Sequence, residues 1–249
     1  EVKDSLFLNI YDGERLIRTL KKKTPKESGF YKWTWRMDEK GKERPSRKIR
    51  ENKFESSGVT VKPGNYKIEL AFNDEKSYSS INVINDPRTD ANQNIDQQYN
   101  SLKEIDDLLQ KSADIVRQLV ESKNIANGLK SRLNKLNKDK FKDEINLSSK
   151  MVKQTDSLVA LFLGKIDKRQ GITRNKESNV QEKIYKAYYY ISSRPNGNTI
   201  TESNLMKHAN NSLNNAVKLV NAFFIEKWKS YKEQMDKLEY SEFKDVKQF

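Results

Sequence analysis

YKIELAFNDEKSYSSINVINDPRTDANQNIDQQYNSLKEI, residues 66–105, contains the change in hydrophobic period that decides the fold. Apolar residues alternate with polar ones from Tyr66 to Phe72, which is the period of a half-buried strand. From Ile95 to Ile105 they recur at steps of three and four, which is the period of a helix face. The chain is therefore expected to combine a β part with a helical part, in the α+β class.

The residues on the amino-terminal side of this stretch repeat the strand pattern. Ser5–Tyr11 alternates, Asp12 and Gly13 form a turn, and Arg15–Leu20 returns as the second arm of a hairpin. Two further strands are predicted at Val59–Lys62 and Tyr78–Ile84, with a Pro-Gly-Asn turn at 63–65. Several short strands with regular turns predict an all-β sandwich over residues 1–88.

The aromatic stretch Phe30–Arg36 (FYKWTWR) is expected to form another strand, with Tyr31, Trp33 and Trp35 on one face. A row of rings can bind a sugar or a peptide by stacking, and it can also fill the core of a sandwich. The core interpretation is favoured because a domain this small needs its rings inside. Residues 37–57, which are rich in both charges, are expected to form a solvated loop.

Asp86, Pro87 and Arg88 connect the two parts. Pro87 has a fixed φ and holds Asp86 extended, and Asp90 has the spacing of a helix N-cap. A stiff, short junction is expected, with Arg88 either binding a ligand or forming a salt bridge.

The helical part, residues 89–249, is expected to be an antiparallel bundle of long, coiled-coil-like helices. One helix of about forty residues follows the junction, because no proline occurs between Pro87 and Pro195. Helices are also predicted after a turn at 137–140, over Val180–Ile191, and from an N-cap at Thr201 onward, with residues 164–177 looped out. The aromatic residues of the last helix are assigned to its core: Phe223, Phe224, Trp228 and Tyr231.

Tyr188, Tyr189 and Tyr190 point in different directions on a helix, so some of these rings must reach the surface or the β part. They are the first choice for a contact between the two parts.

Composition excludes several kinds of chemistry. The chain has no cysteine and only one histidine, His208, so disulfides, thiol nucleophiles, serine–histidine triads and zinc catalysis lack their residues. No catalytic, cofactor-binding or metal-binding residue is therefore assigned, and no apolar run has the length of a membrane span. The net charge of +13 divides into +6 for residues 1–88 and +7 for the rest, mixed with acids. This spread is typical of a lysine-rich surface and argues against a dedicated nucleic-acid site.

The order of these motifs resembles a known family. A hairpin such as LFLNIYDGERLIRTL (6–20), an aromatic stretch, a Pro-Gly-Asn-Tyr turn, Asp86-Pro87-Arg88 and a helical Tyr-Tyr-Ile-Ser-Ser (189–193) follow one another. This order is similar to that of the C-terminal region of large exported bacterial β-propeller proteins, described as sortilin-like, BNR-repeat or glycosyl-hydrolase-like. The first sheet also resembles the immunoglobulin-like module of flagellar hook caps, so an immunoglobulin- or fibronectin-like sandwich is expected.

The resemblance implies an exported protein of the periplasm or cell surface, with a β-propeller upstream as partner. The start at Glu1, without methionine, fits a piece of such a protein. The resulting hypothesis is a non-catalytic accessory or protein-interaction module of a cell-envelope assembly, not an enzyme. A carbohydrate-binding module that uses Trp33 and Trp35, and a nucleic-acid or anionic-surface binder, are the alternatives.

Overall fold

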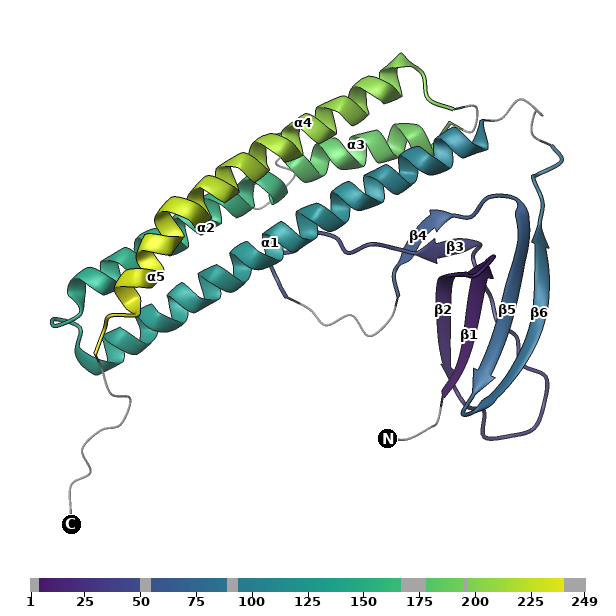
Figure 1. The fold of residues 1–249 in the computed structure, drawn as a ribbon, viewed down its shortest axis with the longest axis horizontal. Helices are drawn as coiled ribbons and strands as arrows, with labels where there is room; N and C mark the ends of the chain where they lie inside the picture. Colours follow the sequence, from purple (N-terminus) through teal and green to yellow (C-terminus); the bar gives the residue numbers. More distant parts are fainter. Residues whose placement is uncertain (1–4, 50–54, 89–93, 167–177, 195–196, 240–249) are drawn as a thin grey trace, which may run out of the picture. The chain divides into compact units, whose positions relative to one another are not determined.

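The computed structural model describes residues 5–49, 55–88, 94–166, 178–194 and 197–239 (Figure 1). It confirms a mixed α+β chain, with an antiparallel four-stranded sheet and helices. The described residues belong to two compact units. Unit 1 contains the sheet, the first helix, α1 (Ile95–Asn137), as far as Gln110, and residues 184–206. Unit 2 contains residues 45–49, 111–183 and the chain from Lys207 onward.

The sheet of unit 1 contains β1 (Ser5–Asp12), β2 (Arg15–Lys23), β5 (Gly64–Phe72) and β6 (Glu75–Val83), in the order β2-β1-β5-β6 (Figure 1). All neighbours are antiparallel. Two-residue loops close both hairpins, and Gly13 and Asn73 supply the positive φ that these turns require. The strands predicted at 5–11, 15–20, 66–72 and 78–84 are confirmed, with ends that differ by a few residues.

One face of this sheet is the core of unit 1. Ile10, Tyr66 and Ile68 are buried on it, because they occupy alternate positions on neighbouring central strands. Ile17 and Val61 complete the cluster, and four partly buried side chains pack against it: Leu8, Leu20, Trp35 and Val83. The opposite face is polar, and its centre is Glu69, which accepts a hydrogen bond from Asn9 Nδ2 at 2.9 Å.

The aromatic stretch 31–35 does not form a strand, so that prediction is wrong. Side-chain alternation is only half of a strand signal, because the backbone must also find a pairing partner. Instead Trp35 turns edge-on to Tyr66, with ring centroids 5.5 Å apart, and its Nε1 donates to the carbonyl of Asp38 at 2.9 Å. Met37 then adopts a positive φ of 57°, which redirects the chain.

Part of the segment expected to be a loop, 37–57, forms a strand. β3 (Asp38–Lys40) pairs with β4 (Ser57–Thr60) in a second, two-stranded sheet. Gly41 and Gly58 permit this pairing, since a Cβ on either would lie under 3 Å from backbone atoms of the other strand. Residues 50–54 of this segment lie outside the described residues.

The helices agree closely with the sequence pattern. They are α1 (Ile95–Asn137), α2 (Lys142–Leu163), α3 (Val180–Ser192), α4 (Ile200–Ala222) and α5 (Lys229–Met235). One stretch of π-helix, η1 (Phe223–Trp228), joins the last two. The 43 residues of α1 confirm the predicted long helix. None of the described helices is apolar over the length that a membrane crossing would require.

The helix caps differ from those predicted. Asn94 caps α1, since its Oδ1 accepts the Gln97 N–H at 3.1 Å, whereas Asp90 lies outside the described residues. Thr201 was predicted to cap α4, but Thr199 does so and Thr201 lies in the first turn. Thr199 is the N-cap because Glu202 lies three residues later and completes a capping box, in which the Glu202 carboxylate accepts a hydrogen bond from the Thr199 N–H at 2.8 Å.

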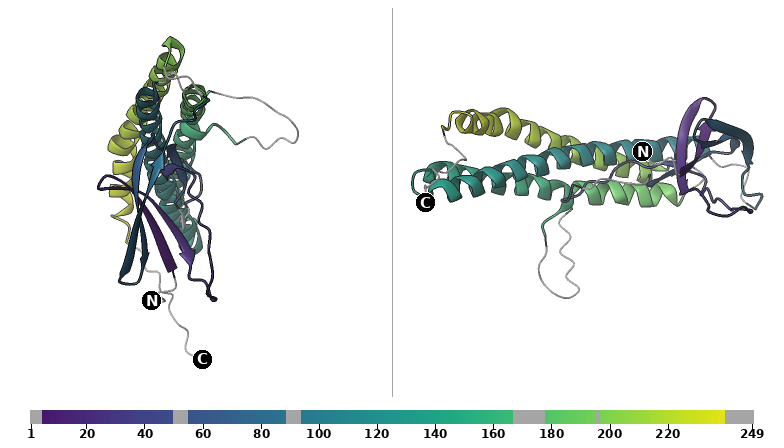
Figure 2. Two further views of the ribbon diagram at one scale, coloured as in Figure 1. Left: turned by 90° about the vertical axis from the view of Figure 1, so that its right-hand side faces the viewer. Right: turned by 90° about the horizontal axis from the view of Figure 1, so that it is seen from below.

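Within unit 2 the helices pack side by side (Figure 2). Leu133 of α1 packs with Phe141 and Ile145 at the start of α2. Ser148 of α2 and Tyr231 of α5 share a buried hydrogen bond of 2.9 Å. The aromatic residues assigned to the core form a chain of ring contacts 5.3–6.3 Å apart, in which Phe223 and Tyr231 are buried.

A candidate interaction surface on the sheet and its helical joint

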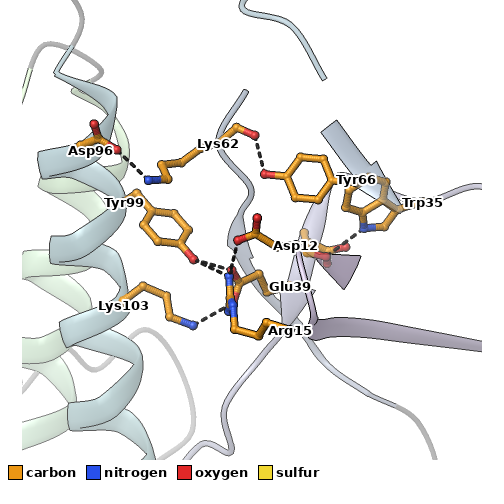
Figure 3. A network of polar contacts seen from close by, with 10 residues as sticks. Asp12, Arg15, Trp35, Glu39, Lys62, Tyr66, Asp96, Tyr99 and Lys103 are labelled. Carbon is orange, nitrogen blue, oxygen red and sulfur yellow. Dashed lines mark hydrogen bonds and ion pairs between the residues drawn. The ribbon is translucent and has the colours of Figure 1, made fainter. Parts of the chain in front are cut away.

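A buried carboxylate, Glu39, joins the sheet to α1 within unit 1 (Figure 3). Its side chain is 5% exposed. Arg15 of β2 binds both carboxylate oxygens, at 2.9 and 3.1 Å. From α1, Lys103 Nζ approaches to 2.8 Å, and the Tyr99 hydroxyl donates a hydrogen bond to Oε1. We call Glu39, Arg15, Tyr99 and Lys103 the joint.

The partners of Glu39 decide its charge. Burial alone would raise the pKa of Glu39, but hydrogen bonds from Arg15, Lys103 and Tyr99 outweigh it and bring the pKa down to about 2. Burial and the hydrogen bond to Glu39 raise the pKa of Tyr99 to about 12. The hydrogen bond to Glu39 likewise raises the pKa of Arg15. The joint therefore holds a carboxylate between two cations across the whole physiological pH range.

Arg18 fixes the other side of β3. It lies opposite Ile10 on the core face and is 8% exposed. Its guanidinium donates to the carbonyl of Glu39 in β3 and to the carbonyls of Glu55 and Ser56, the two residues that precede β4. Asp38 lies 3.7 Å away and balances the charge. Because Arg18 bonds to backbone, it locks the β3–β4 ribbon onto β2 and so positions Glu39.

The start of α1 is also tied to the connection between α3 and α4. Gln98 Nε2 donates to the carbonyl of Ile191 at 2.9 Å, and Asn198 Nδ2 donates to Ser101 Oγ at 2.7 Å. Gly197 adopts a φ of +90°, and a Cβ there would lie 2.3 Å from Gln97 Oε1. The positive φ favours glycine at this position.

A groove of about 600 Å³ lies beside the joint, between α1, α3 and the strand ends. Its lining is mostly apolar: Met37, Val59, Val61, Pro63, Val83, Ile84, Ile95, Leu102 and Tyr188 are among its walls. Lys62 borders it and reaches α1, where its Nζ lies 2.7 Å from Asp96 Oδ1.

The groove brings together half of the residues that the sequence singled out at the junction. Asp86, Pro87 and Tyr188 all contribute to its lining. Arg88 instead forms an exposed ion pair with Asp86 at 2.6 Å. Tyr189 and Tyr190 are exposed outside the groove, with ring centroids 5.9 Å apart.

The two tryptophans of the aromatic stretch have different surroundings. Trp35 packs against the core cluster, whereas Trp33 is half-buried under the ammonium of Lys22, 5.4 Å from its ring centroid. Phe30 and Tyr31, just before them, are exposed.

The two edges of the four-stranded sheet are treated differently. At the β2 edge, the Thr19 N–H donates to Glu55 Oε2 at 2.9 Å, and the strand ends in Lys21, Lys22 and Lys23. Along the β6 edge no described strand pairs, and every residue from Glu75 to Asn82 is exposed. Charges and side-chain contacts protect edge strands, so β6 is the open edge of this sheet.

Sequence reasoning missed the joint itself. Glu39 lies in a stretch where acids and bases alternate, and nothing in that pattern separates a buried carboxylate from a solvated one. Tyr99 was recognised only as part of a helix face, and Lys103 carried no signal.

Comparison with protein-family models, curated proteins and solved structures finds no match to this chain. Among the described residues, no group of three or more His, Asp or Glu side chains could hold a metal ion. The interpretation of the surface therefore depends on its own geometry.

Proposed function

We propose that this chain is a non-catalytic structural and protein-interaction module, in which the joint holds the sheet in a defined orientation on the first turns of α1. The observation that supports this is the environment of Glu39. Its carboxylate is only 5% exposed and accepts hydrogen bonds from β2 and from α1. A buried charge is tolerated only with its partners in place. Displacement of α1 from the sheet within unit 1 would remove the hydrogen bonds from Tyr99 and Lys103 and leave this buried carboxylate with Arg15 alone.

Two further contacts reinforce the orientation. Lys62 bonds to Asp96 and lies over the Tyr99 ring, 5.3 Å from its centroid, so it contacts the first two turns of α1. The main-chain N–H of Glu43 donates to Gln110 Oε1 at 3.0 Å, three turns further along the helix. Contacts spread over this length resist rotation as well as separation. A fixed orientation suits a module that presents a surface or spaces its neighbours.

The setting proposed for this module is the C-terminal region of a larger exported β-propeller protein, in the periplasm or at the cell surface. The order of the hairpin, the Pro-Gly-Asn-Tyr turn and Asp86–Arg88 supports it through the family resemblance. An immunoglobulin-like sandwich followed by a bundle of long antiparallel helices belongs to the same proposal. The β3–β4 ribbon, followed by Val61 over the core face, supports the sandwich, and the 43-residue α1 supports the bundle.

Distance measurements between paired spin labels test the role of the joint. The chain has no cysteine, so Ser77→Cys on β6 and Asp107→Cys on α1 give a uniquely labelled pair of exposed sites within unit 1. We expect a narrow distance distribution, and a clearly broader one after Glu39→Ala. Asp12→Asn is the matched control, because Asp12 pairs with the same Arg15 but is half exposed. A broad distribution in the parent protein, or an unchanged one in Glu39→Ala, would refute the proposal.

Carbohydrate binding is a second candidate, because Phe30 and Tyr31 are exposed beside the half-buried Trp33. Exposed rings in a row can stack on sugar faces. Titration with a glycan panel, followed by tryptophan emission in a Trp228→Phe background, tests it. A saturable change that Tyr31→Ala abolishes is expected if this candidate is right, and unchanged emission across the panel would remove it.

A further inference from the structure

We propose that β6 is an acceptor edge for an extended, acidic segment of a partner protein, which adds to the sheet as a fifth strand. This goes beyond the joint, and the two proposals can fail separately. The starting observation is the contrast between the edges: β2 is covered by Glu55, Arg18 and a run of lysines, whereas residues 77–83 of β6 carry no charge and no proline. Native proteins usually protect long edge strands, and an unprotected edge is a template for pairing with another chain.

The backbone of β6 has hydrogen-bonding capacity to offer. The hairpin loop Asn73-Asp74 closes on the pair Phe72↔Glu75. A two-residue turn closes on a hydrogen-bonded pair, so every second residue after Glu75 is expected to face β5. The residues between them, Lys76, Tyr78, Ser80 and Asn82, then direct their N–H and C=O groups away from the sheet. A strand laid alongside would pair with these groups over about 20 Å.

The side chains of β6 specify one apolar face of the partner. Ile81 is paired with Tyr66 and so lies on the core face of the sheet, where it is still 43% exposed. Val83 shares this face, and together with Ile84 it also lines the groove beside the joint. An added strand with apolar residues at alternate positions would cover Ile81 and continue the core toward the groove.

The opposite face specifies the charge of the partner. Lys67 is exposed, and its Nζ lies between two rings, 5.5 Å from the centroid of Tyr11 and 5.0 Å from that of Tyr78. These contacts hold the ammonium on the outer, polar face of the sheet beside Tyr78 of β6, one strand away from an added strand, which would lie about 4.8 Å beyond β6. An acidic side chain on the outer face of the partner would meet this ammonium.

Charge also decides between a foreign partner and a second copy of this chain. Each copy carries a net charge of +13, so pairing of two β6 edges would bring two strongly basic surfaces together. An acidic segment would instead be attracted by the positive charge of this chain. The occupant is therefore an acidic strand with alternating apolar residues, recognised by backbone pairing and alternate side-chain contacts.

A short synthetic peptide tests the proposal on the full chain. The probe is a capped peptide of about seven alternating valine and glutamate residues, and the comparison peptide has lysine in place of glutamate. We expect the valine–glutamate peptide to shift the amide resonances of residues 76–83 saturably and to slow hydrogen exchange at Tyr78, Ser80 and Asn82. The lysine peptide should bind several-fold more weakly.

Two variants make the test specific. Ser80→Pro removes an outward N–H without removing a bond to β5, and should abolish peptide binding, while Ser80→Thr keeps the N–H and should bind as the parent does. Lys67→Glu reverses the charge of an exposed side chain, and should reverse the preference by about twofold to fivefold toward the lysine peptide.

Three results would overturn the proposal. The resonances of β6 could stay unchanged at every peptide concentration, or Ser80→Pro and Lys67→Glu could both bind like the parent. The third concerns the protein without peptide. If hydrogen-exchange protection at Ser80 and Asn82 rises with protein concentration, and sedimentation shows a dimer over the same range, the β6 edge pairs with a second copy of the chain.

Discussion

Replacing Glu39 by Gln removes the charge at the centre of the joint and keeps its shape. The pKa of Glu39 falls from 4.5 to about 2 on folding, and this difference corresponds to about 3 kcal/mol of stability at neutral pH. Arg15 is half exposed and Lys103 is partly exposed, so both can regain water in the variant. We therefore expect the free energy of unfolding of unit 1 to fall by about 2–3 kcal/mol, which is less than the roughly 3–5 kcal/mol of a fully buried broken pair.

The pH dependence gives this prediction its sign. The folded-state pKa of Glu39 is depressed, so its contribution is fully present above 4.5 and is lost as the pH falls toward 2. The parent protein and Glu39→Gln should consequently differ most at pH 6–7 and converge between about pH 4.5 and pH 2. Exposed ion pairs of the joint region contribute little to this difference.

Urea unfolding at a series of pH values measures the effect. In a Trp228→Phe background the emission comes from Trp33 and Trp35, and both belong to unit 1. Asp12→Asn is again the control, and it should shift the midpoint little at any pH, since Asp12 is half exposed. Equal midpoints for the parent and Glu39→Gln at pH 7, or a difference that stays constant down to pH 3, would show that Glu39 does not stabilise unit 1.

Further predictions concern two glycines and one buried hydrogen bond, all measured by thermal or urea unfolding. Gly128→Ala should stabilise the protein by about 0.5–1 kcal/mol, because it lies within α1 with nothing within 4 Å of the added Cβ, and a loss of stability would contradict this. Gly197→Ala should destabilise the protein by at least about 1 kcal/mol, because φ is +90° there and the added methyl group would contact Gln97 Oε1. An unchanged unfolding midpoint would contradict this and show that the connection between α3 and α4 adjusts to the methyl group. Ser148→Ala and Tyr231→Phe should each lower the free energy of unfolding by about 1 kcal/mol, because each single change leaves one buried hydroxyl without its hydrogen-bond partner. The double variant should lower it by clearly less than the sum of the two single effects, and full additivity would argue against a direct hydrogen bond.

Local patterns of the sequence predicted most of the regular structure. Alternation identified β1, β2, β5 and β6, and the three- and four-residue steps identified α1, α2, α3 and the helical end of the chain. These periods are present in the sequence because most of these elements bury one face. The aromatic stretch shows the limit of the method, since Tyr31, Trp33 and Trp35 alternate perfectly and form no strand. Pairing is a property of two segments, and alternation describes only one.

Only those residues of the candidate surface that stand out in the local sequence were predicted. Asp86, Pro87 and Tyr188 were singled out, and they do line one groove. The other walls of that groove come from three further segments of the chain, around Met37, at 58–63 and at 95–102, so no single window of sequence could indicate it. The difference between an open and a covered sheet edge also depends on where Glu55 and Arg18 lie in space.

The sequence by itself determined the class of the chain, the places of most of its strands and helices, and the kinds of chemistry for which it lacks residues. Those properties depend on composition and on periods of two and 3.6 residues, which neighbours along the chain express. Only the tertiary structure decided that Glu39 is a buried carboxylate with a pKa of about 2 and that β6 is left open. The pKa of Glu39 depends on partners 24 to 64 residues away in the sequence, and the open edge depends on the lack of a pairing strand among the described residues. Neither property produces a periodic pattern in the sequence.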